Sequence, residues 1–140
     1  MMAYSSIAQA GFLMIALASF TIEGLHFLLF YASVFLLMNF LVFIVIQQFE
    51  TGFQTTSIPM LSGLGKKAIV PSVLILIGLI SLTGLPPTGG FTSKLFIFTS
   101  LWDSYSQSGK SVLLILFLVG LFNTVVALFF YLKIPYFLFI

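Results

Sequence analysis

Apolar segments about as long as a bilayer is thick follow one another along this 140-residue chain, and they constrain its fold more than any other feature. A helix needs about 20 predominantly apolar residues to span the hydrocarbon core of a membrane. Segments that approach this length cover residues 3–20, 25–47, 68–84, 87–102 and 111–131. We therefore predict an all-α, polytopic integral membrane protein with about five transmembrane helices, in which residues 1–140 form a single membrane domain surrounded by lipid bilayer.

The scarcity of charge supports this class and excludes several functions. Only 6% of the residues are charged and 61% are hydrophobic, whereas soluble domains carry about 25% charged residues. The chain has no cysteine, which rules out thiolate catalysis and iron–sulfur ligation, and its single histidine, His26, cannot build a metal site by itself. There is no glycine-rich phosphate loop. We expect no metal, cofactor or nucleic acid to bind to this chain.

Lys94 is the charge that this composition explains least well. It lies in apolar sequence just after Pro86–Gly90, where two prolines remove backbone donors and glycines permit unusual backbone angles. The pattern predicts a broken or turned helix near Pro86–Gly90. At bilayer depth an ammonium group costs at least about 2.5–3.5 kcal/mol. The neighbours of Lys94 along its own helix, Phe91, Ile97 and Phe98, offer no counter-ion.

Two interpretations of Lys94 are open. Its four-carbon stem could carry the ammonium outward to the lipid headgroups, as lysines near helix ends often do. Alternatively, the amine is desolvated inside the protein, where burial disfavours its charged form and allows it to exchange a proton with a chain of water molecules. The second interpretation makes Lys94 the first candidate for a catalytic proton-transfer group.

Three further residues are candidates for a proton relay. Lys133, near the end of segment 111–131, could serve as a proton entry or exit group or simply anchor the helix at the interface. His26 titrates near neutrality, and it follows Glu23 by three residues, so the two could equally form an interfacial pair. Tyr4, with the serines that follow it, could bind water or link neighbouring helices.

The distribution of charges also predicts a topology. If all five segments span the membrane, Lys66, Lys67 and Lys110 lie on one face, and Glu23, His26 and Lys133 lie near the other. Lysines in short loops mark the cytoplasmic or matrix side. The first 20 residues lack the basic start of a signal peptide, and neither end carries a polar anchor. We expect the sequence to be a piece of a longer polytopic chain or the product of a split gene.

Several stretches together resemble one family. Residues 3–12, Ala-Tyr-Ser-Ser-Ile-Ala-Gln-Ala-Gly-Phe, look like a helix of the antiporter-like membrane subunits of NADH–quinone oxidoreductase, or respiratory complex I. Residues 28–31, Leu-Leu-Phe-Tyr, resemble its next helix. Residues 82–94, Leu-Thr-Gly-Leu-Pro-Pro-Thr-Gly-Gly-Phe-Thr-Ser-Lys, are similar to the signature of the N-type subunit, and residues 129–133, Phe-Phe-Tyr-Leu-Lys, to the helix after it. The lysine at position 94 favours the N-type over the M- and L-type chains.

The resemblance implies a larger subunit built from two inverted repeats, of which this chain supplies the second, with Lys94 as the output-side lysine. The chain would then be a non-redox, proton-translocating subunit of an oxidoreductase. NAD, FMN, iron–sulfur clusters and quinone would bind to other subunits, and its partners would be other membrane subunits, including neighbouring antiporter-like chains. Its location would be the bacterial inner (plasma) membrane or, alternatively, the mitochondrial inner membrane. A subunit of a multi-subunit cation/proton antiporter is the alternative function.

Overall fold

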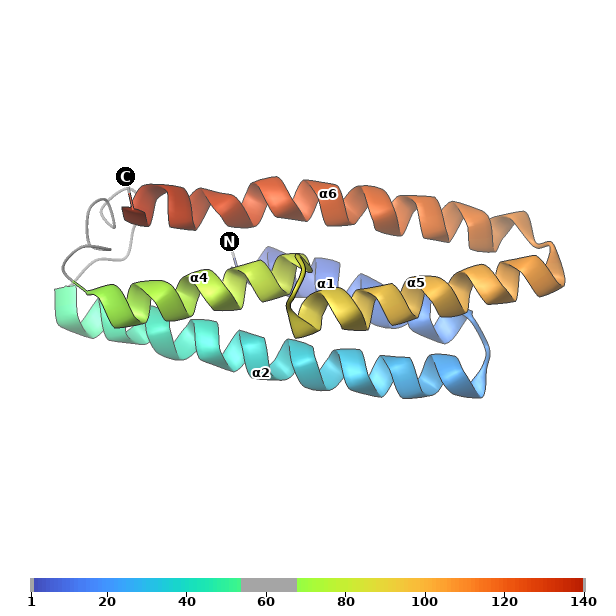
Figure 1. Cartoon of the computed structure of the whole chain (residues 1–140), viewed down its shortest axis with the longest axis horizontal. Helices are drawn as coiled ribbons and strands as arrows, with labels where there is room; N and C mark the ends of the chain where they lie inside the picture. Colours follow the sequence, from blue (N-terminus) through green and yellow to red (C-terminus); the bar gives the residue numbers. More distant parts are fainter. Residues whose placement is uncertain (1, 54–67, 140) are drawn as a thin grey trace.

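The computed structural model describes residues 2–53 and 68–139, and the described part of the chain is helical without strands. Its helices are α1 (Met2–Ala18), α2 (Ile22–Phe53), α4 (Ile69–Thr83), α5 (Gly89–Ser108) and α6 (Ser111–Phe139) (Figure 1). By length and composition α2 and α6 are apolar enough to cross a membrane, and α1 and α4 are shorter apolar helices. The predicted all-α, polytopic membrane fold is confirmed.

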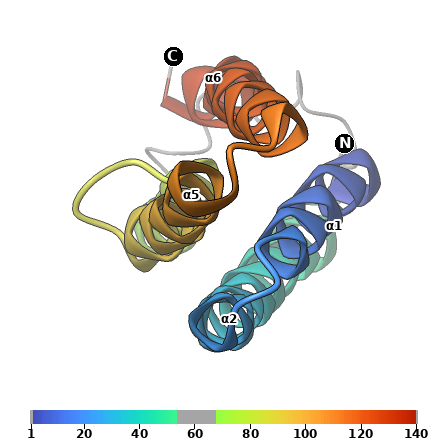
Figure 2. The ribbon, with the colours of Figure 1, turned by 90° about the vertical axis from the view of Figure 1, so that its right-hand side faces the viewer.

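The helices surround a common centre when the bundle is seen from its end (Figure 2). One core cluster joins the second half of α2 to α4 and α6, and it includes Val42, Ile75, Leu79 and Ile134. A second cluster joins α1, the first half of α2 and α5, and it includes Phe12, Ala16, Tyr31 and Ile97. Large apolar side chains are exposed on the outside of every helix. An apolar exterior of this extent suits contact with lipid or with other membrane helices.

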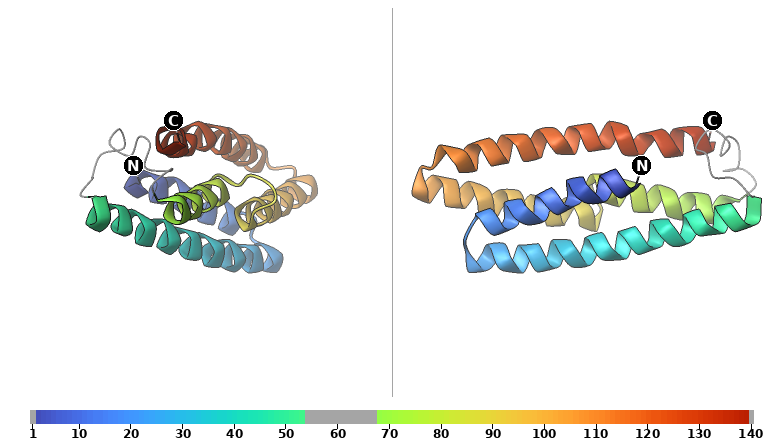
Figure 3. Two further views of the ribbon diagram at one scale, coloured as in Figure 1. Left: turned by 60° about the vertical axis from the view of Figure 1, so that its left-hand side comes forward. Right: turned by 180° about the vertical axis from the view of Figure 1, so that it is seen from behind.

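Helices α4 and α5 follow one another end to end, and both lie along α2 (Figures 1 and 3). The predicted break at Pro86–Gly90 is therefore a break within one discontinuous helix. Helices α4 and α5, predicted as segments 68–84 and 87–102, contact different parts of α2 and meet each other near their junction. Together they therefore run along about the same length of the bundle as α2 does alone.

This arrangement changes the predicted topology. The α1–α2 connection and the α5–α6 connection lie at the same end of the bundle, so Lys110 shares that end with Glu23 in the first turn of α2. The sequence-based prediction placed these two residues on opposite faces, because it counted α4 and α5 as separate crossings. Lys66 and Lys67 lie outside the described residues.

The junction between α4 and α5 follows from its local sequence. Gly84 adopts a left-handed backbone (φ 83°), and its N–H and that of Leu85 donate to the carbonyls of Ser81 and Ile80, which closes α4 with a Schellman motif. Pro86 and Pro87 then offer no backbone donor. The extended backbone of Thr88 precedes the first turn of α5. The chain thus ends one helix and starts the next within five residues, partway along the bundle, and Pro86 and Pro87 are exposed on its outside.

Candidate functional site: a buried lysine at the helix break

The structure places the side chain of Lys94 inside the bundle, beside the end of α4. Only 4% of the residue is exposed, although it lies in the second turn of α5. Its Nζ donates hydrogen bonds to the carbonyl oxygens of Leu82 and Thr83, both at 3.1 Å. The side chain therefore points to the helix break and does not extend to a headgroup layer.

The two carbonyls that hold the amine belong to the last turn of α4. The last carbonyls of a helix have no partner within that helix. Those of Ile80 and Ser81 accept from the N–H groups of Gly84 and Leu85, whereas those of Leu82 and Thr83 receive Lys94. The carbonyl end of a helix also carries the negative pole of its dipole, which favours a cation there.

An aromatic ring completes the surroundings of the amine. Nζ lies 4.6 Å from the centroid of the Phe12 ring on α1, which is close enough for a cation–π interaction. The chain contains three carboxyl residues, Glu23, Glu50 and Asp103, and all of them are exposed. The ammonium form of Lys94 is thus stabilised within this chain by backbone dipoles and a ring, and its positive charge is not neutralised there.

Polar side chains from three other helices lie next to Lys94 and form a continuous set of hydrogen bonds. We call Ser5 and Gln9 on α1, Tyr31 on α2 and Tyr131 on α6 the polar cluster. The Gln9 Nε2 donates to the Leu82 carbonyl at 3.0 Å and to the Tyr131 hydroxyl at 3.3 Å. The Tyr31 hydroxyl donates to the Gln9 Oε1, and the hydroxyls of Ser5 and Tyr131 also bond. All four residues are buried.

The Leu82 carbonyl joins the polar cluster to the amine, because it accepts from both Gln9 and Lys94. A small cavity adjoins this point, lined in part by Gln9, Tyr31, Ser81 and Lys94, and it offers about 10 Å³ to the centre of a water molecule. About that volume is needed to hold one water. The arrangement therefore brings an amine, an amide, hydroxyl groups and room for about one water together in the interior.

The other candidate residues from the sequence do not join this site. Tyr4 is 76% exposed, and His26 and Lys133 are also exposed. Exposure of Tyr4 and burial of Ser5 follow from helix geometry, because adjacent residues point about 100° apart around a helix. The structure brings none of these three side chains into the hydrogen bonds around Lys94 that are described above.

Gln9, Tyr31 and Tyr131 were not singled out as site residues from the sequence. Each is one of a few polar residues within an apolar segment, and only the contacts between helices reveal that they face one another. One sequence signal for this cluster was present in α1. Ser5 and Gln9 are four residues apart, so they lie on one face of the helix and form a polar stripe there.

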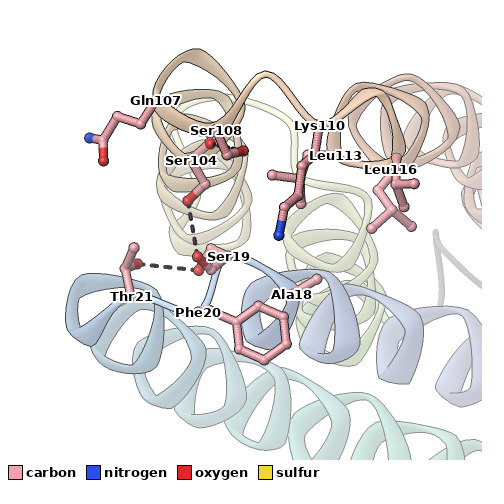
Figure 4. Close-up of a pocket in the computed structure, with 11 residues that line it drawn as sticks. Ala18, Ser19, Phe20, Thr21, Ser104, Gln107, Ser108, Lys110, Leu113 and Leu116 are labelled. Atoms are coloured by element: carbon pink, nitrogen blue, oxygen red, sulfur yellow. Dashed lines mark hydrogen bonds between the residues drawn. The ribbon is translucent and has the colours of Figure 1, made fainter.

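A second polar region lies at the end of the bundle where α1 turns into α2 and α5 turns into α6 (Figure 4). The Ser104 hydroxyl donates to the Ser19 carbonyl at 3.1 Å, and the hydroxyls of Ser19 and Thr21 are 3.3 Å apart. Beside these bonds lies an open pocket of about 530 Å³ between the two connections, which Lys110 also lines. The hydroxyls fasten α5 to the α1–α2 connection and so hold that end of the bundle together.

Metal ligands do not gather in the described ranges, where no group of three or more His, Asp or Glu side chains could hold an ion. The chemistry available around Lys94 is thus that of an amine, an amide and hydroxyl groups. Such groups donate, accept and exchange protons.

Comparison with known proteins identifies the family. Residues 1–130 match the family model described as NADH:quinone oxidoreductase/Mrp antiporter, TM. The chain is 40% identical over 134 residues to the NAD(P)H-quinone oxidoreductase subunit 2 of Nostoc punctiforme, which covers 96% of this chain and 24% of that protein. It is 33% identical over 133 residues to the NADH-quinone oxidoreductase subunit N 2 of Solidesulfovibrio magneticus, which covers 95% of this chain and 27% of that protein.

The chain therefore spans about a quarter of the length of these curated relatives. The predicted resemblance to subunit N, or subunit 2, is confirmed by both the family model and the relatives. The chain belongs to the family of antiporter-like membrane subunits shared by NADH:quinone oxidoreductases and Mrp antiporters.

Proposed function

We propose that this chain is part of a proton-translocating subunit of NADH–quinone oxidoreductase and that Lys94 carries the proton. The observation that supports this role most directly is the buried amine at the break between α4 and α5, held by the carbonyls of Leu82 and Thr83. Oxidation of NADH and reduction of quinone would occur in other subunits, which would bind NAD, FMN, iron–sulfur clusters and quinone. The partners of this chain would be the other membrane subunits of that complex.

The surroundings of Lys94 suit a group that gains and loses a proton. Burial disfavours the ammonium form, while the two carbonyls, the dipole of α4 and the Phe12 ring favour it. Because no carboxylate of this chain neutralises the amine, a change of charge or hydration nearby acts on its protonation without strong competition. Charge movement driven by the redox reaction elsewhere in the complex could thus load and unload Lys94.

The polar cluster supplies a route for the proton on one side of Lys94. Tyr131 accepts from Gln9 and bonds to Ser5, so hydroxyl groups extend from the amine toward the first turns of α1. Hydroxyl groups can accept one proton while releasing another. Tyr4, His26 and Lys133 are exposed in this chain, and we propose that any relay role they have lies at the ends of the route.

The same site supports a second candidate function, a subunit of a multi-subunit cation/proton antiporter, because the matching family includes the Mrp antiporters. A proton-carrying lysine serves either system. The relatives reported above are quinone oxidoreductase subunits, which favours the first candidate. We propose the bacterial plasma membrane as the location, with the mitochondrial inner membrane as the alternative.

Replacing Lys94 with methionine in the full-length subunit tests the proposal. Methionine fills a similar space and cannot carry a proton, so NADH-driven proton pumping into proteoliposomes should fall at least tenfold while the complex still assembles. Lys110→Met is the matched control, because Lys110 is exposed, and it should pump like the wild type. Wild-type pumping by an assembled Lys94→Met complex would refute the role of Lys94. Proton transport that depends on Na⁺ and proceeds without NADH would favour the antiporter function.

A further inference from the structure

Among the residues that the structure describes, the hydrogen bonds of Lys94 and of the polar cluster meet at the carbonyl oxygen of Leu82. It lies 3.1 Å from the Lys94 Nζ and 3.0 Å from the Gln9 Nε2. Since both donors bond to one oxygen, roughly 6 Å at most separates the ammonium from the amide nitrogen. Neither α1 nor α5 could shift against the end of α4 without changing this shared contact.

The amide of Gln9 is fixed on both sides. Its Nε2 donates to Leu82 and Tyr131, and its Oε1 accepts from the Tyr31 hydroxyl. The residue is 2% exposed, so bulk solvent does not reach these bonds. Turning the amide over would place its oxygen against the Leu82 carbonyl oxygen, which has no hydrogen to donate. The Leu82 carbonyl therefore determines which way the amide points, and the two tyrosine hydroxyls, which can donate or accept, hold it in that orientation.

We infer that Gln9 is a positioning residue that sets how strongly the end of α4 holds the protonated form of Lys94. A carbonyl oxygen that also accepts from Gln9 stabilises the ammonium less than one that serves the ammonium alone. A rearrangement of Tyr31 or Tyr131 that withdraws the amide from Leu82 strengthens the hold on the proton, and its return weakens it. Gln9 transmits this change without titrating itself. This inference rests on the proposed function of Lys94.

The groups that face the amine come from each helix packed against it. Gln9 and Phe12 face it from α1, Tyr31 lies across the small cavity on α2, and α4 presents the two carbonyls. Tyr131 on α6 reaches it through Gln9. The titratable groups among these are the two phenols, and the carboxyl groups of the chain are exposed. A carboxylate introduced at position 9 would thus be a new kind of charge at this site.

The variant Gln9→Glu in the assembled complex provides the test. It replaces a neutral amide with an isosteric carboxylate, and an opposite charge within about 4–6 Å changes a protonation equilibrium by roughly one to three pH units. The alkaline limb of the pH profile of NADH-driven pumping should move to higher pH by at least about one unit. Gln47→Glu is the matched control, because it makes the same change at an exposed position on α2, and it should leave the profile in place.

A second variant, Gln9→Met, keeps the volume of the side chain and removes both of its hydrogen-bonding groups. Its profile should move in the same direction by less than that of Gln9→Glu, because the Leu82 carbonyl then serves the ammonium alone. If Gln9→Glu fails to assemble, Gln9→Met decides. If the Gln9 variants assemble and their pH profiles of pumping match that of the wild type, the inference is overturned. It is also overturned if neither Gln9 variant assembles while Gln47→Glu does, because the role of Gln9 would then be purely structural.

The two proposals fail in different ways. If Lys94→Met abolishes pumping and the Gln9 variants keep the wild-type profile, the positioning role is refuted and the proton-carrying role stands. If Lys94→Met pumps normally, the proton-carrying role is refuted whatever the Gln9 variants do.

Discussion

Gly90 is where the two halves of the broken helix approach each other through their backbones. A Cβ added there would overlap the carbonyl oxygen of Ser81, and the Ser81 hydroxyl already accepts from the Gly90 N–H at 3.3 Å. A backbone carbonyl cannot rotate away as the end of a flexible side chain can. The variant Gly90→Ala must therefore push the start of α5 away from the end of α4.

The cost of this change can be estimated from the packing. Overpacking of a close-packed interior costs about 1–3 kcal/mol, and a rigid backbone obstacle places Gly90→Ala at the upper end of that range. Alanine recovers roughly 0.5–1 kcal/mol relative to glycine in a helix. The net loss is about 2 kcal/mol of folding free energy. The displacement that relieves this overlap would also lengthen the 3.1 Å bonds from Lys94 to the α4 carbonyls.

Denaturation of the purified full-length subunit in detergent, followed by circular dichroism, measures the stability, and proton pumping by the assembled complex measures the function. Gly11→Ala is the matched control, because no atom lies within 4 Å of the added Cβ on α1. That variant should be stabilised by about 0.5–1 kcal/mol. If Gly90→Ala is as stable as Gly11→Ala, the close approach of α4 and α5 at Gly90 is wrong.

Three further predictions follow from the same geometry. Gly84→Ala should lower the stability by about 1–2 kcal/mol in the same denaturation assay, because Gly84 has a left-handed backbone (φ 83°) and a Cβ there would lie 3.0 Å from the Lys94 Cδ. Tyr131→Phe should lower it by about 1–3 kcal/mol, because Gln9 loses an acceptor in a buried position, and a value near zero would show that water replaces the hydroxyl. The chain has no cysteine, so single cysteines at Glu23 and Lys110 can be tested with a membrane-impermeant thiol reagent in a complex free of other reactive cysteines. Both should react from the same side of the membrane, and reaction from opposite sides would contradict the discontinuous helix.

The helix ends were predicted best where glycine or proline marks the boundary, whereas α2 continues to Phe53 and α6 to Phe139, beyond the expected ends at residues 47 and 131. Segment 68–84 became Ile69–Thr83, closed at Gly84 as glycine allows. The predicted segment 87–102 was too short at its C-terminal end. Helix α5 continues through polar residues to Ser108 and stops where Gly109 takes a left-handed conformation (φ 64°). Hydropathy assigns the polar end of a membrane helix to a loop, although the backbone hydrogen bonds of the helix continue beyond the hydrocarbon layer of the membrane.

The relative placement of the helices was much harder to predict. Nothing in the local sequence shows that α5 continues the direction of α4 and does not turn back beside it, because both arrangements use the same glycines and prolines. The contacts of both halves with α2 decide the matter, and they are long-range packing. The same holds for the polar cluster, whose members lie up to 126 residues apart along the chain. Their alignment depends on how each helix is rotated.

One feature of the sequence nevertheless determines the chemistry of the site. In a continuous α-helix the carbonyls of Leu82 and Thr83 would accept from the N–H groups four residues later, at positions 86 and 87. Both positions are proline and have no N–H. These are the two carbonyls that receive the Lys94 amine. The proline pair thus removes the backbone donors from two buried acceptors, and the lysine satisfies them. Deprotonation of Lys94 would leave its amine with two hydrogens for these two carbonyls, so the neutral form can still bond to both while it no longer carries a charge. The break in the helix therefore supplies partners for both protonation states.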